Sequence, residues 1–138
     1  MDETTRAAVA GGLLALCLAG DVSAGGDSGP VDLELRNAGT ETLRCVTVLA
    51  HFVSLPAAEV APGKTWTSTF HRTGESGTLF VLRDDGREMM VENLICGTSD
   101  DWDTTRGEVP LLDLRSTPAD RVMFSCRIAS RLACEPGL

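Results

Sequence analysis

The feature that most constrains the fold of this chain is a pair of alternating segments joined by an Asp-Gly turn. Residues 78–83 and 88–94 alternate apolar with polar or charged side chains, with Asp84-Asp85-Gly86-Arg87 between them. A period of two is typical of β-strands, and Asp-Gly between such segments is a strong hairpin signal because glycine accepts a positive φ. We therefore expect a hairpin whose two-residue loop is Asp85-Gly86. Its facing pairs would be Arg83 with Glu88, Leu82 with Met89, and Phe80 with Val91, the last two on the buried face.

Several other segments have the composition or alternation of strands, and turn signals such as Asn37-Ala38-Gly39 and Pro62-Gly63 separate them. They are residues 31–36, 43–53 (ending before Pro56), 65–70, 109–115 and 121–128. No long apolar stripe at helical spacing follows Pro30. About seven short strands separated by turns predict an all-β fold, specifically an immunoglobulin-like β-sandwich over residues 31–138. A small barrel is the alternative.

Four cysteines fall in this region, namely Cys45, Cys96, Cys126 and Cys134. An even number in a short exported domain indicates disulfide bonds. A zinc site is disfavoured because no Cys-x-x-Cys pair occurs. Three pairings are open; we favour Cys126 with Cys134, which a single turn separates, leaving Cys45 and Cys96 to tie distant strands.

The N-terminal segment has the pattern of an export signal. Residues 7–20 are an unbroken run of apolar and small residues, followed by Val22-Ser23-Ala24, a small-residue cleavage site. The run is shorter than the ~20 residues that span a bilayer. We therefore expect a cleaved signal peptide at 1–24, a linker at 25–30 and a periplasmic or extracellular protein. An uncleaved signal helix that tethers the protein to a membrane through residues 7–20 is the alternative.

The charge balance disfavours two classes of partner. The chain carries 12 basic and 20 acidic residues, a formal net charge of −8. Such a chain lacks the basic face that follows phosphates, so we expect no binding to nucleic acid. Anionic membrane surfaces are disfavoured for the same reason.

The stretch Gly26-Asp27-Ser28-Gly29-Pro30 resembles, one glycine short, the segment that carries the nucleophile in trypsin-like serine proteases. A serine nucleophile needs a histidine base and a third group that orients it. In those proteases the serine follows both partners, whereas Ser28 precedes both histidines of this chain. We therefore interpret the stretch as linker, and we expect neither catalytic residues nor a cofactor.

Two sets of residues could bind metal ions. His51, His71 and Met90 are candidate ligands of a soft copper(I) site. Met90 is the candidate rather than Met89, because the expected hairpin register places Met89 in the core. Calcium could use Asp100, Asp101, Asp103 and Glu108, but the usual order of a calcium-binding loop is absent. A copper- or calcium-binding module is thus the alternative function, against the interpretation of structural histidines and a solvated loop.

The loop from Gly97 to Glu108 is the preferred candidate for a binding site. It groups Asp100, Asp101 and Asp103 around Trp102, and tryptophan is enriched at binding hot spots. We expect a small, non-catalytic accessory domain that binds another protein through this loop, through a sheet face or through an edge strand.

Overall fold

The computed structural model describes residues 28–137. The expected signal segment, including residues 7–20, and residues 25–27 of the expected linker lie outside the described residues. In the described part, nine strands form one open sheet of mixed direction. The all-β class is therefore confirmed, whereas the immunoglobulin-like arrangement stays a prediction. None of the helices between residues 28 and 137 has the length and apolar character needed to cross a bilayer.

The strands follow one another along the chain with three short helical segments between them. The strands are β1 (Gly29–Asn37), β2 (Leu43–Leu49), β3 (Val53–Val60), β4 (Thr65–Arg72), β5 (Leu79–Leu82), β6 (Glu88–Gly97), β7 (Gly107–Glu108), β8 (Arg121–Ile128) and β9 (Leu132–Pro136). The helical segments are η1 (Ala50–Phe52), α1 (Trp102–Thr105) and α2 (Leu112–Ser116). The predicted strands at 31–36, 65–70, 78–83, 88–94 and 121–128 are confirmed.

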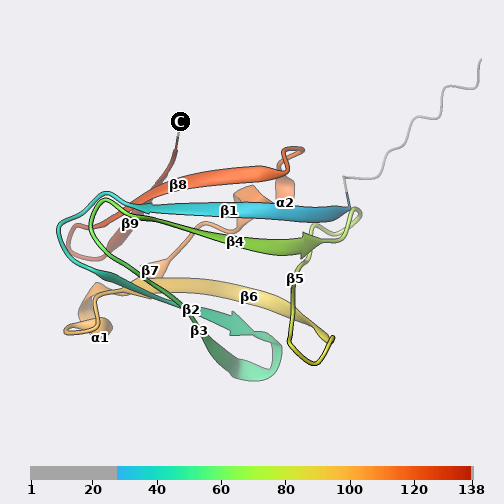
Figure 1. Ribbon diagram of the computed structural model, residues 1–138, viewed down its shortest axis with the longest axis horizontal. Coiled ribbons are helices and arrows are strands. Elements are labelled where there is room, and N and C mark those ends of the chain that lie inside the picture. Colours follow the sequence, from blue (N-terminus) through green and yellow to red (C-terminus); the bar gives the residue numbers. More distant parts are fainter. Residues whose placement is uncertain (1–27, 138) are drawn as a thin grey trace, which may run out of the picture.

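The sheet is folded into two layers that face each other (Figure 1). Its strand order is β3-β2-β6-β5-β4-β1-β8-β9, and β7 pairs with β6. β4, β1 and β8 lie in one layer and β3, β2 and β6 in the other, while β5 passes between them (Figure 1). β1 and β8 are parallel, and the other pairs are antiparallel. The short β5 therefore joins both layers into one hydrogen-bonded sheet.

The hydrophobic core lies between the layers. Alternate residues of β1, namely Val31, Leu33 and Leu35, are fully buried, as the period of a half-buried strand requires. Phe70 of β4 and Phe124 of β8 are also buried. The second layer and the segment after β6 complete the core with Leu43, Leu49, Val60, Val91, Leu94, Val109, Leu111 and Leu114.

Both disulfide bonds are present, with the favoured pairing of Cys45 with Cys96 and Cys126 with Cys134. Each bridge joins directly opposite residues of neighbouring antiparallel strands, β2 with β6 and β8 with β9. The first bridge therefore ties strands that are distant in the sequence but adjacent in the sheet. These bonds indicate an oxidising, exported environment.

The expected single strand over 43–53 is wrong, because the chain turns back within it. β2 and β3 form a hairpin, and Pro56, expected to lie beyond the strand, lies inside β3. His51 and Phe52 have φ angles of 64° and 61° at the turn, the sign that a type I′ turn needs at both central positions. Neither residue is a common choice there, so the sequence carried no turn signal. Proline is tolerated in β3 because β3 is an edge strand.

Phe52 is unfavourable in two ways, because its backbone is left-handed and its side chain is 90% exposed. A glycine in this conformation avoids the steric cost, and little packing is lost. We expect Phe52→Gly to raise the free energy of unfolding by about 1 kcal/mol, after allowance for the greater freedom of glycine in the unfolded chain. Urea denaturation measures the change. Phe52→Ala keeps the backbone strain and should leave stability unchanged; a less stable Phe52→Gly would contradict this explanation.

The hairpin of β5 and β6 is confirmed, but its register differs by one residue from the expected one. The observed pairs are Leu82 with Glu88, Val81 with Met89, and Phe80 with Met90. Arg83 N–H donates to Arg87 O, and Gly86 N–H donates to Arg83 O, both at 2.9 Å. The loop therefore has three residues and ends on Gly86 at φ 79°, which is the bulged type of hairpin loop.

This shift reverses the two faces of β5. Leu79 is fully buried, whereas Leu82, expected in the core, is 60% exposed. A one-residue slip moves every side chain of a strand to the other face. On β6 the expected placement of Met89 in the core is confirmed: Met89 packs against the core and Met90 is exposed.

The strand expected over 109–115 is wrong, and a helical turn takes its place. The strand β7 ends at Glu108, and α2 begins at Leu112. Pro110 has no N–H to donate to a strand ladder. Leu111 and Leu114 are both buried at the spacing of a helical turn. The last strand, β9, was not expected.

Candidate functional site

The loop expected to bind a partner is an ordered surface beside the end of β6. It contains α1, which begins at Trp102, and the side chains of Asp100, Asp101 and Asp103 are exposed there. The half-buried Trp102 ring is covered by the guanidinium of Arg44 from β2, whose Cζ lies 5.1 Å from the ring centroid. We call these five residues the Trp102 surface. The stack is a cation–π contact between side chains distant in the sequence.

Hydrogen bonds within the loop fix the backbone that carries Trp102. Thr105 Oγ1 accepts a hydrogen bond from Thr98 N–H at 2.9 Å and donates one to the carbonyl of Asp101 at 2.6 Å. Both threonines are buried. Gly97 packs so closely that a Cβ there would lie 2.9 Å from Arg106 Cα. The Trp102 surface is therefore held by buried contacts.

One carboxylate of the Trp102 surface, that of Asp103, has an ion-pair partner in Arg106, the residue that follows α1. Arg106 Nη1 lies 3.9 Å from Asp103 Oδ1, and both side chains are more than half exposed. An exposed pair at this distance contributes little to stability. The acidic side chains are therefore exposed to solvent, with little charge compensation from this pair.

The candidate copper ligands come from three separate elements. His51 lies in η1, His71 in β4 and Met90 in β6. Phe80 of β5 pairs with both His71 and Met90, so it lies between them in one row across three strands. Among residues 28–137, no group of three or more His, Cys, Asp or Glu side chains is arranged to hold a metal ion. A copper or calcium site stays a prediction that no contact supports.

Ser28, the serine of the protease-like stretch, has a structural contact. Its Oγ accepts a hydrogen bond from Gly74 N–H at 2.6 Å, at the start of β1. This bond ties the first described residue to the loop between β4 and β5.

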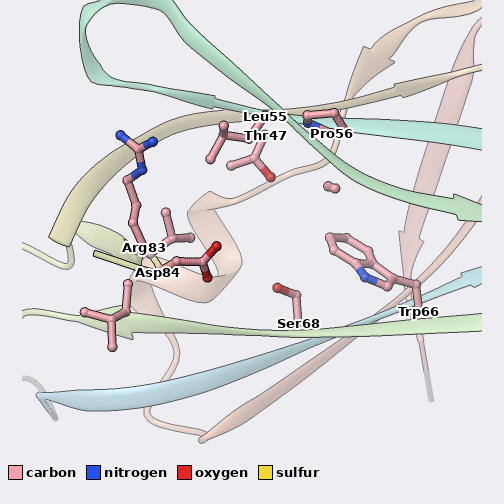
Figure 2. A pocket seen from close by; sticks show the side chains of 10 residues that line it. Thr47, Leu55, Pro56, Trp66, Ser68, Arg83 and Asp84 are labelled. Atoms are coloured by element: carbon pink, nitrogen blue, oxygen red, sulfur yellow. The ribbon is translucent and has the colours of Figure 1, made fainter. Parts of the chain in front are cut away.

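A pocket of about 350 Å³ that the sequence did not indicate lies between β3 and β4. Trp66 and Ser68 point into it from β4, opposite Thr47, Leu55 and Pro56 of the other layer (Figure 2). Arg83 and Asp84 of the β5–β6 loop lie at the other end from Trp66 (Figure 2). We call it the β3–β4 pocket. Trp66 and Ser68 share a face because they alternate along β4, and the rest of the wall comes from strands whose pairing the sequence did not reveal.

Comparison with known proteins supplies no relative: no protein-family model, curated protein or solved structure matches the chain.

Proposed function

We propose that the protein is a small, exported, non-catalytic accessory domain that binds another protein, as a subunit of a periplasmic or membrane-associated complex. The observation that carries this proposal is the Trp102 ring held on the Arg44 guanidinium beside three exposed carboxylates. Tryptophan and arginine are among the residues enriched at binding hot spots.

The fixed backbone of the Trp102 surface also supports this proposal. The buried bonds of Thr98 and Thr105 are formed without a partner, so binding would not have to order the loop. Preorganisation reduces the entropy that association costs. The three carboxylates favour a partner with an apolar centre and basic groups around it.

We also infer that the two layers are a variant of the immunoglobulin-like sandwich. The hydrophobic core, enclosed between facing layers of mostly antiparallel strands, supports this inference. One feature departs from antibody domains, because Cys45–Cys96 joins neighbouring strands rather than the two layers. Such a framework presents loops and strand edges for binding.

We expect Trp102→Ala to abolish capture of the partner from an extract of the exported proteins of the native cell. The thermal midpoint should move by only a few degrees, because Trp102 is half-buried and outside the main core. Affinity pull-down followed by mass spectrometry measures capture, and a thermal melt measures the midpoint. Phe52→Ala, which removes an aromatic ring that is 90% exposed, is the matched control and should keep the partner. Retained capture together with a large fall in midpoint would assign Trp102 to packing and refute the docking site.

A further inference from the structure

The first part of β4 is paired on one side only. β1 pairs with β4 from Thr65 to Arg72, whereas β5 pairs with it at His71 and Arg72. In the sheet of the described residues, β4 has no neighbours besides β1 and β5. Residues 65–69 therefore form an open sheet edge.

Two hydrogen bonds show which backbone groups point to this edge. Asn37 N–H donates to Lys64 O at 2.9 Å, on the β1 side. Thr73 N–H donates to Thr78 O at 3.1 Å, on the β5 side. The N–H and C=O groups of successive residues in a strand point to alternate sides, so even-numbered residues of β4 face β1. The backbone groups of Thr65, Thr67 and Thr69 consequently point outwards, toward the open edge.

The neighbouring edge, that of β3, is less suited to pairing. Pro56 lies in the middle of β3 and has no N–H, and the β2–β3 register shifts beside Val46. Proline and bulges are the devices by which edge strands avoid pairing with other chains. β4 has neither device over residues 65–69.

The β3–β4 pocket lies beside this open edge. Trp66 and Ser68 direct their side chains into it (Figure 2), while Thr65, Thr67 and Thr69 are exposed on the other face. Residues directly opposite one another in paired strands share a face. A strand added to β4 would therefore place the residues opposite Trp66 and Ser68 in the pocket, against Leu55 and Ala57.

Charge on the outer face favours basic residues at the remaining positions of an added strand. Asp32 of β1 lies directly opposite Thr69, whereas Glu34, opposite Thr67, is already paired with Arg121. Asp32 accepts a hydrogen bond from Thr69 Oγ1 at 2.7 Å, so its carboxylate leans toward β4. A long lysine side chain on an added strand could reach over Thr69 toward it. The net charge of −8 also favours basic residues on the added strand.

We propose that residues 65–69 bind an extended segment of a partner protein by antiparallel strand addition, the direction in which β4 pairs with β1 and β5. The segment alternates aliphatic residues, which enter the β3–β4 pocket, with threonine or lysine residues that face solvent. The backbone groups of Thr65, Thr67 and Thr69 supply the hydrogen bonds, and the pocket supplies the side-chain specificity. This site is separate from the Trp102 surface, so either can fail without the other.

The probe is the synthetic peptide acetyl-Lys-Val-Thr-Val-Lys-Val-Thr-amide. The chain has two tryptophans, so Trp102→Phe leaves Trp66 as the single reporter in the pocket. We expect saturable binding of the peptide, with a change in Trp66 emission. A wild-type chain that binds no peptide at millimolar concentration overturns the proposal.

N-methylated peptides separate strand addition from simple apolar docking. In a strand added antiparallel to β4, the N–H groups of the lysine and threonine residues face β4 and those of the valines face away. N-methylation of three of the four lysine and threonine residues should weaken binding at least about tenfold, because it removes hydrogen bonds to β4. The same number of methyl groups on the valines should leave binding nearly unchanged. Equal affinity of the two peptides refutes strand addition, and this comparison uses the unchanged protein.

A matched pair of variants tests the same edge from the protein side. Thr67→Pro removes an N–H that points away from β1, so the β1–β4 ladder is kept, and peptide affinity should fall about tenfold. Thr67→Val changes only the exposed side chain and should bind normally. Normal binding by Thr67→Pro contradicts the proposal. So does a concentration-dependent dimer that Thr67→Pro abolishes, because the occupant would then be a second copy of this chain.

Discussion

Replacing both Cys45 and Cys96 with alanine is expected to lower the free energy of unfolding by about 4 kcal/mol. The bridge closes a segment with a sequence separation of 51, and the entropy that a cross-link removes from the unfolded chain grows with the length of that segment. Both cysteines are also buried in the core. Urea denaturation of the variant and the wild type, each without reductant, measures the change.

The second bridge is the matched control for this prediction. Cys126 and Cys134 also join opposite residues of neighbouring antiparallel strands, but their sequence separation is 8. Their replacement by alanine should cost about 2.5 kcal/mol, because the closed segment is shorter. If this second pair proved the more costly one, chain entropy would not be the main contribution of these bonds.

The second large effect is expected at Arg72, whose side chain is buried at the end of β4. Its Nη1 donates to Leu114 O at 2.8 Å and to Thr117 O at 2.5 Å, and its Nη2 lies 3.4 Å from Ala119 O. These carbonyls belong to the last turn of α2 and the segment that leads to β8. Arg72 therefore supplies donors to carbonyl groups that a short helix leaves unpaired at its C-terminal end.

We expect Arg72→Met to lower the free energy of unfolding by about 3 kcal/mol, because methionine keeps much of the apolar stem but leaves the carbonyls of Leu114 and Thr117 without these donors. Arg72→Lys should lie in between, since an ammonium group cannot reproduce the planar fork of a guanidinium. Chemical denaturation of the three proteins measures both differences.

Arg121 offers the comparison with an exposed arginine. Its Nη1 lies 3.2 Å from Glu34 Oε1, and its side chain is 59% exposed. Arg121→Met should cost less than about 1 kcal/mol, as is usual for surface ion pairs. Equal losses at Arg72 and Arg121 would show that the carbonyl contacts of Arg72 contribute little.

The candidate binding residues could be predicted from the sequence only in part. The grouping of Trp102 with Asp100, Asp101 and Asp103 is local, so composition was enough to find it. Arg44, which completes the Trp102 surface, is far away in the sequence and meets Trp102 because β2 pairs with β6. The β3–β4 pocket depends on the unexpected β2–β3 hairpin, since Leu55 and Ala57 reach it from β3.

Local pattern by itself determined the class of this protein, most of its strands and its disulfide chemistry. Alternation over residues 31–36 and 121–128 placed β1 and β8, because a side-chain period of two reflects one buried and one wet face. The even number of cysteines predicted both bridges. These properties depend on residues that are neighbours in the sequence or on the number of cysteines, so they can be predicted without knowing which strands pair.

Tertiary structure decided the turn at His51 and Phe52, the register of the β5–β6 hairpin and the helical turn α2. In each case contacts between distant residues outweighed a weak or ambiguous local preference. Asn37 shows the same principle: it was expected as a turn residue, yet its side chain is fully buried and its Nδ2 donates to Val60 O at 2.8 Å. The open edge of β4 is likewise a property of the assembled sheet, because it exists only where β5 leaves β4 to pair with β6.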